Sequence, residues 1–555
     1  MAKKILYDAE ARAAVLGGAK ELYDAVKVTM GPKGRNVVIQ KSYGGPTISH
    51  DGVTVAKAVD IEIKKDGSNL GYNVGSELIK QAASKTNDTV GDGTTTSTVL
   101  AYHILEEANK MIAAGHNPMD LKKGLDSASE QVLRDIAGMT DQVAGNKEKI
   151  AQVATVSAGD SDIGNLIAEV IEAVGEDGSV TVEQSQTLEM EKEIVEGFKI
   201  DRGYVSTYMV TDPARMEASY EKPLILVTDK KIGSIQEILP IIEKVAQSGR
   251  KDMVIIAEDV EGEALATLVL NRLKGVFNAL AIKAPAFGDR RKAILQDIAT
   301  LTGATVISEE QGYSFENATV DMLGSARKII STKDDTTIIE GDGDDEAVNS
   351  RIAEIKAQAE NATSDYEKEN FEKRLSALAG KVAVIKVGGV TETEIEEKKF
   401  RVDDAVAATK AAVAEGIVSG GGVILVDLSK NLKVEATTVA GSAAAGQLIL
   451  KNALVQPFKQ LMANAGLNAE ANLAEVLASK QNGFGFDVNS PEKLVNLKDA
   501  GIVDPAKVTR EAIQNAVSIA GTAMTMGSLI VDIPEDKAAG AAGGGMAGSM
   551  GGMDY

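Results

Sequence analysis

The residues best suited to chemistry in this sequence are a Gly-Asp-Gly turn at 91–93 and the three threonines at 94–96. Glycine lets the backbone approach a ligand closely, and the apolar spacing after the threonines predicts a helix. The N-terminus of a helix attracts phosphate, and Asp92 is a hard oxygen ligand suited to magnesium. The alternative is a glycine turn followed by a threonine helix cap.

Two further turns precede this one and could face it. A helical pattern over residues 9–30 ends in a Gly-Pro-Lys-Gly segment, where glycine and proline stop helices. Residues 36–40 and 46–50 are typical of two strands that form a hairpin, and Asp51 with its following glycine comes directly afterwards. Three separate loops could therefore converge around one phosphate group.

The remaining elements divide the chain into blocks. Helical spacing at 75–85, 97–114 and 119–137 makes the first block mainly α, and a helix at 163–174 with a strand at 179–183 predicts a smaller connecting module. Between about 193 and 382, strands and helices alternate, which indicates an α/β domain.

Two helices in the second half of the sequence carry side chains of interest. The segment 264–270 is apolar around more of its circumference than one buried stripe needs, so it either leaves a face for a partner or is buried on both sides. Asp404 lies off the apolar stripe of a long helix at 394–415, and periodicity alone predicts an exposed carboxylate there. Residues 346–360 and 365–379 predict an antiparallel helical hairpin.

Composition excludes several classes of function. The chain has 555 residues, enough for three or four domains, and no cysteine, so a metal site would be built from carboxylates and would favour magnesium. A formal charge of −22 opposes binding to nucleic acid and to anionic membranes. The N-terminus does not resemble a secretory signal and no long apolar run occurs, so a cytoplasmic location is expected. The Walker phosphate loop, H-E-x-x-H and G-x-S-x-G are all missing.

Six motifs, taken together in this order, identify a family. They are VKVTMGPKGRN at 26–36, GDGTTT at 91–96, AEDVEGEALAT at 257–267, GDRRK at 288–292, AVIKVG at 383–388 and SGGGV at 419–423. With these motifs the chain resembles the group I chaperonin subunit of bacteria, the GroEL type or 60 kDa chaperonin, over essentially its full length.

This resemblance implies a multidomain α and α/β fold. The implied parts are an all-α equatorial ATP-binding domain at 1–139 and 415–530, a small α/β intermediate hinge domain at 140–195 and 383–414, an α/β apical domain at 196–382, and a flexible Gly/Ala/Met tail at 531–555. The implied function is ATP-dependent capture and folding of non-native polypeptides by a homo-oligomer of two stacked seven-membered rings with a co-chaperonin lid. The implied cofactors are ATP, Mg²⁺ and K⁺.

The resemblance also implies roles for individual residues. Asp92 would be the metal ligand, Asp404 the carboxylate that orients the attacking water, and Asp51 a second catalytic acid. The implied nucleotide-binding residues are Thr29, Met30, Gly31, Pro32, His50, Asp92, Gly93, Thr94, Thr95, Thr96, Gly421, Asp487, Val488, Asn489 and Asp504. Two of them depart from the family pattern, since His50 replaces a usual lysine and Asp487 a common asparagine.

A second set of residues would bind clients and control the cycle. The implied substrate and co-chaperonin surface is Tyr204, Tyr208, Met209, Leu239, Ile242, Leu265, Val269 and Leu270. Arg202 and Glu392 match an inter-subunit ion pair with an allosteric role. Two rival functions are an adhesive assembly that binds clients without turnover and a small-molecule kinase. The three carboxylates Asp51, Asp92 and Asp404 favour hydrolysis, and the missing phosphate-loop lysine counts against a kinase.

Overall fold

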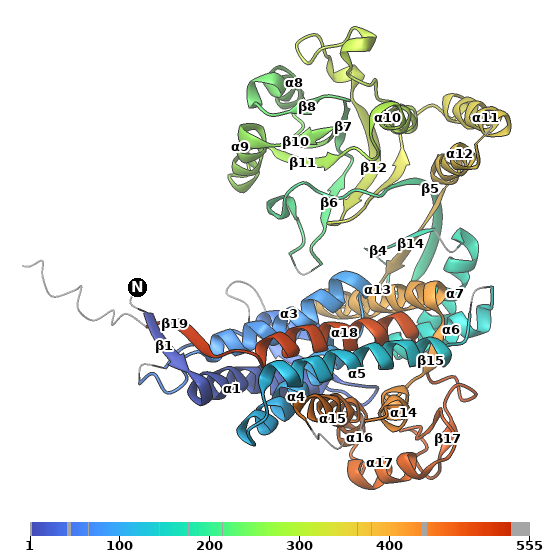
Figure 1. Cartoon of the computed structure of the whole chain (residues 1–555). Coiled ribbons are helices and arrows are strands. Elements are labelled where there is room, and N and C mark those ends of the chain that lie inside the picture. Colours follow the sequence, from blue (N-terminus) through green and yellow to red (C-terminus); the bar gives the residue numbers. More distant parts are fainter. Residues whose placement is uncertain are drawn as a thin grey trace, which may run out of the picture. The chain divides into compact units, whose positions relative to one another are not determined.

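The computed structural model describes residues 3–533 except 41–45, 65, 144, 176–177, 186, 214, 363, 379 and 435–440. The chain forms two compact units. The first unit combines Met1–Asn165 with Glu396–Tyr555, so both ends of the sequence share it, and the second unit is Leu166–Ile395 (Figure 1). The division into three domains implied by the family resemblance stays a prediction.

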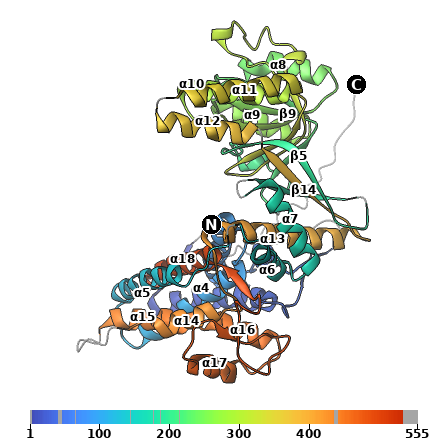
Figure 2. The ribbon, with the colours of Figure 1, turned by 90° about the vertical axis from the view of Figure 1, so that its right-hand side faces the viewer.

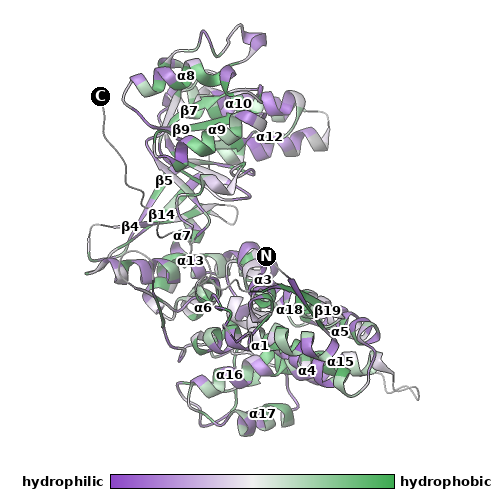
Figure 3. Cartoon of the chain, turned by 90° about the vertical axis from the view of Figure 1, so that its left-hand side faces the viewer, coloured by the Kyte–Doolittle hydropathy of each residue, from purple (hydrophilic) through white to green (hydrophobic). Residues whose placement is uncertain are grey.

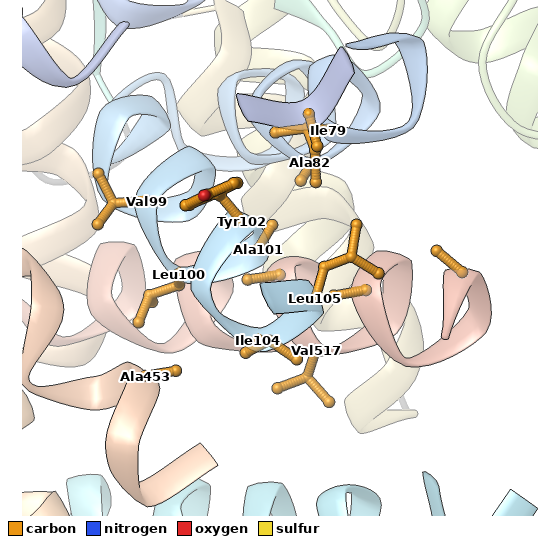
Figure 4. Close-up of a cluster of buried hydrophobic side chains, with 14 of the residues drawn as sticks. Ile79, Ala82, Val99, Leu100, Ala101, Tyr102, Ile104, Leu105, Ala453 and Val517 are labelled. Carbon is orange, nitrogen blue, oxygen red and sulfur yellow. The ribbon is translucent and has the colours of Figure 1, made fainter. Parts of the chain in front are cut away.

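Long helices make up the core of the first unit. They are α1 (Asp8–Val26), α3 (Tyr72–Val90), α4 (Thr94–Ala113), α5 (Pro118–Gly138), α15 (Ser442–Leu454) and α18 (Ala506–Ala523). Helix α4 packs against each of the other five, and most of its circumference is buried. Figure 4 shows its apolar side chains between those of α3, α15 and α18. Because α4 is held on so many sides, its N-terminus is a fixed point for a site.

Shorter elements complete this unit. The helices are α2 (Gly52–Ala58), α6 (Lys147–Ala158), α14 (Val423–Asn431), α16 (Gln456–Asn464) and α17 (Ala469–Ala478). Helices α7 (Ser161–Val174) and α13 (Glu392–Glu415) each cross the boundary between the two units. The predicted hairpin is present as β2 (Val37–Ile39) and β3 (Thr47–Ser49), paired antiparallel.

Three more two-stranded sheets occur among the described residues of this unit. They pair β1 (Lys3–Tyr7) with β19 (Ser528–Asp532), β15 (Ile417–Ser419) with β18 (Val503–Pro505), and β16 (Phe484–Gly485) with β17 (Val495–Asn496). Val531 and Asp532 pair with Lys4 and Lys3, so the predicted start of the tail at 531 is wrong by two residues. Residues 534–555 lie outside the described part of the chain.

A nine-stranded mixed sheet organises the second unit. Its order is β11-β9-β7-β12-β13-β5-β14-β4, with β6 paired to β12. The strands are β4 (Ser179–Gln184), β5 (Glu191–Ile200), β6 (Ala218–Glu221), β7 (Leu224–Val227), β9 (Asp252–Ala257), β11 (Asn278–Lys283), β12 (Gly324–Ser331), β13 (Thr336–Gly341) and β14 (Lys381–Val387). The parallel strands β7, β9 and β11 are almost wholly buried. Figure 3 shows the apolar character of β7 and β9.

Helices cover this sheet. They are α8 (Ile235–Gln247), α9 (Gly262–Leu273), α10 (Gly288–Thr302), α11 (Asp345–Asn361) and α12 (Asp365–Leu378). One helical unit and one α/β unit confirm the expected multidomain α and α/β class.

The predicted helical hairpin is present, and a buried carboxylate fixes it to α10. Helices α11 and α12 run side by side next to α10 (Figure 2). Asp297 of α10 is fully buried and accepts bonds from Arg351 Nε at 2.8 Å and from Arg374 Nε at 2.7 Å. A buried charge is stabilised when it is paired, and these two ion pairs link both helices of the hairpin to α10.

Candidate functional site

The first of the three predicted turns is attached to the N-terminus of α4. Thr29 closes a short 3₁₀ helix (Lys27–Thr29), and its Oγ1 lies 3.1 Å from Oγ1 of Thr95. Asn464 Nδ2 of α16 donates to the carbonyl oxygens of Lys27 and Met30, both at 2.9 Å. Gly31 has a φ of +80°, and Pro32 beside it is exposed. The turn is therefore held from two sides.

The second turn reaches the same helix end through a glycine. The Asp51 carboxylate caps α2, accepting from the N–H groups of Val53 at 3.2 Å and Thr54 at 2.8 Å. A Cβ placed on Gly52 would lie 2.3 Å from Oγ1 of Thr95 and 2.9 Å from its backbone nitrogen. Only a residue without a side chain allows this approach, so Gly52 brings Asp51 beside α4.

The third turn leaves the start of α4 open. Gly91 and Gly93 have φ values of +69° and +78°, and a Cβ on Gly93 would lie 2.6 Å from Cγ1 of Val508. Gly93 is the N-cap residue, and no side chain caps the helix. The alternative of a threonine cap is therefore wrong. Thr94, the first helical residue, is buried, and the first N–H groups of α4 have no capping acceptor among the described residues.

Acidic side chains gather at this helix end. The Asp92 carboxylate accepts from the N–H of Gly93 at 2.5 Å and from Oγ of Ser157 at 3.4 Å. Burial raises the pKa of Asp92, and the charge of Asp51 raises it further. Burial also raises the pKa of Asp504, which lies on β18, to about 7, and the charge of Asp92 adds to this effect. Because the charge of Asp51 affects the pKa of Asp92 and the charge of Asp92 affects the pKa of Asp504, Asp92 lies within electrostatic range of both other carboxylates.

This acidic cluster fits a divalent cation. No lysine or arginine in the described ranges forms an ion pair with Asp92 or Asp504, so their charges are not neutralised by the protein. Hard cations favour carboxylate oxygens. The described residues contain no group of three or more His, Asp or Glu side chains arranged to hold a metal, so an ion at Asp92 would need further ligands such as phosphate oxygens and water.

Asp404 lies on the face of α13 that meets the Gly-Asp-Gly turn. It is half-buried, unlike the exposed position that periodicity alone predicts. Ala407 and Ala411 share its face of the helix, because they follow at three and seven residues. Ala407 Cβ would lie 2.6 Å from a Cβ on Gly91, and Ala411 packs against Val90. Asp404 therefore belongs to the same neighbourhood as Asp92.

The glycine-rich turn at 420–422 lies beside Asp504. Strands β15 and β18 pair Val418 with Asp504, and the N–H of Gly420 donates to the Ile502 carbonyl at 3.0 Å. Gly421 has a φ of +63°, which favours glycine at this position. The turn thus approaches the acidic cluster from the C-terminal part of the chain.

The residues expected near the base lie further out on a loop. Asp487 accepts from the N–H of Asn489 at 2.9 Å, which turns the loop between β16 and β17, and Asn489 is exposed. Val488 packs at the edge of a small core that contains Leu497. Leu497 Cδ1 would lie 3.7 Å from a Cβ on Gly421, which links the base of this loop to the glycine turn.

His50 packs against the first turn. Its Cε1 would lie 2.8 Å from a Cβ on Gly34, and it makes a hydrogen bond with the Gly31 backbone. Burial lowers the pKa of His50, although Glu397 acts in the opposite direction. A neutral imidazole does not supply the positive charge of the family's usual lysine.

Only some of the residues predicted for the client surface are exposed. Tyr208 is 64% exposed and Leu270 50%. Half-buried members of the set are Leu239, Ile242, Leu265 and Val269. Tyr204 and Met209 are buried, with 7% and 0% exposed, so their placement on an exposed surface is wrong. Met209 Sδ accepts from the N–H of Ala281 at 3.2 Å inside the core, and Tyr204 forms a β-bridge with Ile282.

The apolar helix α9 is not buried on both sides. Its only fully buried residues are Ala264 and Leu268, so the alternative of burial on both sides is wrong. The sequence reasoning missed Leu273, the last residue of α9, and Val276, which follows three residues later; they are 63% and 62% exposed. Continuing the apolar pattern past residue 270 would have found them.

Arg202 and Glu392 both lie in the second unit and are exposed. Neither side chain forms an ion pair with another described residue. Each is therefore available to a partner.

The fold and this site define a chaperonin-type protein, and comparison with known proteins agrees. Residues 22–534 match the model of the TCP-1/cpn60 chaperonin family, so the chain belongs to that family. A similar solved structure is the chaperonin gp146 from the bacteriophage EL 2 (Pseudomonas aeruginosa) in the presence of ATP-BeFx. It is 20% identical, with a TM-score of 0.65, and the match covers 96% of this chain and 99% of gp146. At this identity the likeness shows the fold alone. No helix of the described residues is long and apolar enough to cross a bilayer.

Proposed function

We propose that this chain is an ATP-hydrolysing chaperonin of the bacterial group I type, acting in the cytoplasm. The observation that best supports this proposal is that three turns, at residues 29–34, 51–52 and 91–93, converge on the uncapped N-terminus of α4. Membership of the TCP-1/cpn60 family and the ATP analogue present with the phage chaperonin support the choice of nucleotide.

The residues at this site suit the binding of a triphosphate. The free N–H groups at the start of α4 and the hydroxyls of Thr94, Thr95 and Thr96 would donate to phosphate oxygens. Asp92 would hold Mg²⁺, which offsets phosphate charge when it is bound. Backbone carbonyls near Thr29 and His50 would hold K⁺. Gly421, Asp504 and the 487–489 loop would contact the nucleoside.

Hydrolysis needs a positioned water, and two carboxylates could provide it. Asp404 shares the face of α13 on which Ala407 packs against the Gly-Asp-Gly turn, and Asp51, which caps α2, lies within electrostatic range of Asp92. A carboxylate at Asp404 would orient the attacking water, and Asp51 would assist it from the other side. The protein supplies orientation and electrostatic stabilisation, as expected for phosphoryl transfer.

Clients would bind to exposed apolar residues of α8, α9 and the neighbouring segment. Tyr208 and Leu270 are the most exposed members of the predicted set, and Leu239, Ile242 and Leu265 lie half-buried beside them. Val269 completes the set. Burial of apolar area at about 25 cal/mol per Å² holds non-native chains without reading their sequence. We propose that a co-chaperonin lid binds the same surface, and that Arg202 and Glu392 pair between subunits of two stacked seven-membered rings.

The decisive variant is Asp404→Ala. We expect ATP affinity to stay within twofold of the wild type and steady-state hydrolysis to fall at least a hundredfold, since positioned acid–base groups contribute about 10²–10⁴ in rate. Isothermal titration calorimetry and phosphate release measure the two quantities. Glu396→Ala, which removes an exposed carboxylate from the same helix, is the matched control and should hydrolyse normally. Normal ATP turnover in Asp404→Ala would refute the proposed role of Asp404 in hydrolysis. Electron microscopy of the purified protein tests separately whether it forms two stacked seven-membered rings.

A further inference from the structure

A polar cavity lies in the second unit beside the exposed apolar residues. Its volume is about 430 Å³, and it is bounded by β6, the first residues of β9 and β11, the C-terminal end of α9 and the segment after Met209. Figure 1 shows α9, β11 and β6 in this part of the unit. Leu273, one of the exposed apolar residues, also lines the cavity, so the two features are continuous.

A buried hydroxyl lines this cavity. Tyr220 is only 4% exposed, and its hydroxyl forms no hydrogen bond of regular geometry among the described residues, although the Arg272 guanidinium lies beside it. Burial raises the pKa of the Tyr220 phenol, and the nearby Arg272 guanidinium opposes that rise. A buried hydroxyl without a well-formed hydrogen bond is unfavourable, so a ligand that bonds to it would be stabilised.

The charged groups of the cavity are predominantly acceptors. Glu221 and Asp252 form no ion pair within the described ranges, and Asp252 accepts one bond, from Asn278 Nδ2 at 2.7 Å. The only cationic side chain in the lining is that of Arg272.

The donors of Arg272 are largely occupied. Nη1 donates to the Tyr208 carbonyl at 2.5 Å and Nη2 to the Val210 carbonyl at 2.6 Å. The guanidinium therefore holds the wall of the cavity in place. Two carboxylates and one guanidinium give the lining a formal charge of −1.

We infer that this cavity receives a lysine or arginine side chain of a client polypeptide whose apolar residues lie on the adjacent surface. An ammonium or guanidinium group carries several donors, which match the unpaired carboxylate oxygens of Asp252 and Glu221. Clients that place a basic residue next to an apolar run would then bind more tightly than purely apolar ones. This inference rests on the proposed client surface.

Labelled twelve-residue peptides test the inference with the full-length protein. Three peptides share one leucine-rich sequence and differ at a single position, which is lysine, norleucine or glutamate. Fluorescence anisotropy gives each dissociation constant. We expect the lysine peptide to bind at least fivefold more tightly than the norleucine peptide in the wild type. In Asp252→Asn, which can still accept from Asn278, we expect this preference to fall below twofold.

Two further variants separate the cavity from the overall negative charge. Asp321→Asn removes an exposed carboxylate outside the cavity and should keep the full lysine preference. Glu221→Lys should reverse the preference towards the glutamate peptide. An equal loss of lysine preference in Asp252→Asn and Asp321→Asn, or an unchanged preference in Asp252→Asn, would overturn the inference. Tight norleucine binding with no lysine preference would overturn it while leaving the client surface intact, and failure of all three peptides to bind would refute both.

Discussion

Asp504→Asn should stabilise the nucleotide-free protein above neutral pH. Burial raises the pKa of Asp504 to about 7 from an ordinary 3.8, so the folded state binds this proton more tightly than the unfolded state. Ionising the carboxylate therefore destabilises the fold. The penalty is absent below pH 4, grows as the pH rises, and is complete above about pH 7. A pKa difference of about three corresponds to about 4 kcal/mol.

The expected gain is smaller than this limit, about 2 kcal/mol, because the Asp504 side chain keeps partial access to solvent. Urea unfolding followed by far-UV circular dichroism, with EDTA and without nucleotide, measures the difference between variant and wild type. The two proteins should have equal stability at pH 4 and should differ by about 2 kcal/mol at pH 8. A difference independent of pH, or a less stable variant at pH 8, would refute the proposed burial of this charge.

Three further outcomes are expected. Gly52→Ala places a Cβ 2.3 Å from a threonine hydroxyl at the start of α4, so calorimetry should show nucleotide affinity about tenfold weaker with unchanged circular dichroism; unchanged affinity would contradict the convergence of the turns. Met209→Ala should lower the free energy of unfolding by about 2–5 kcal/mol, whereas Tyr208→Ser should change it by under about 0.5 kcal/mol and weaken capture of unfolded protein; equal unfolding effects would argue against their different burial. Arg202→Glu should alter the Hill coefficient of ATP hydrolysis and Glu392→Arg in the same chain should restore it; no restoration would exclude a direct pair.

Local patterns predicted most helices because each helix shows its period within a few turns. The helices expected at 97–114 and 394–415 occupy 94–113 and 392–415. Strands β1 and β19 were missed, since each is five residues long and its partner lies at the other end of the sequence. A short apolar run does not indicate which distant segment it will pair with. The turn at 91–93 was recognisable from its glycines. Gly91 and Gly93 have positive φ values, which glycine adopts more readily than any other residue.

Adjacent residues in the second unit show the limit of such reasoning. Tyr208 and Met209 follow each other in one 3₁₀ turn, yet the first is exposed and the second fully buried. Both are large and apolar, so composition gives them the same expectation. Their difference arises from the strand and helix that pack on one side of the turn, which come from residues about 60 to 70 positions later.

The sequence by itself determined most of the helices, the glycine turns and the absence of cysteine, because these depend on residue types and on spacing over a few residues. Only the tertiary structure decided that the turns at 29–34, 51–52 and 91–93 meet at the start of α4, that Ala407 of α13 packs against the third turn, and that burial raises the pKa of Asp504. Those properties depend on distances between remote segments and on exclusion of water, which no local pattern encodes.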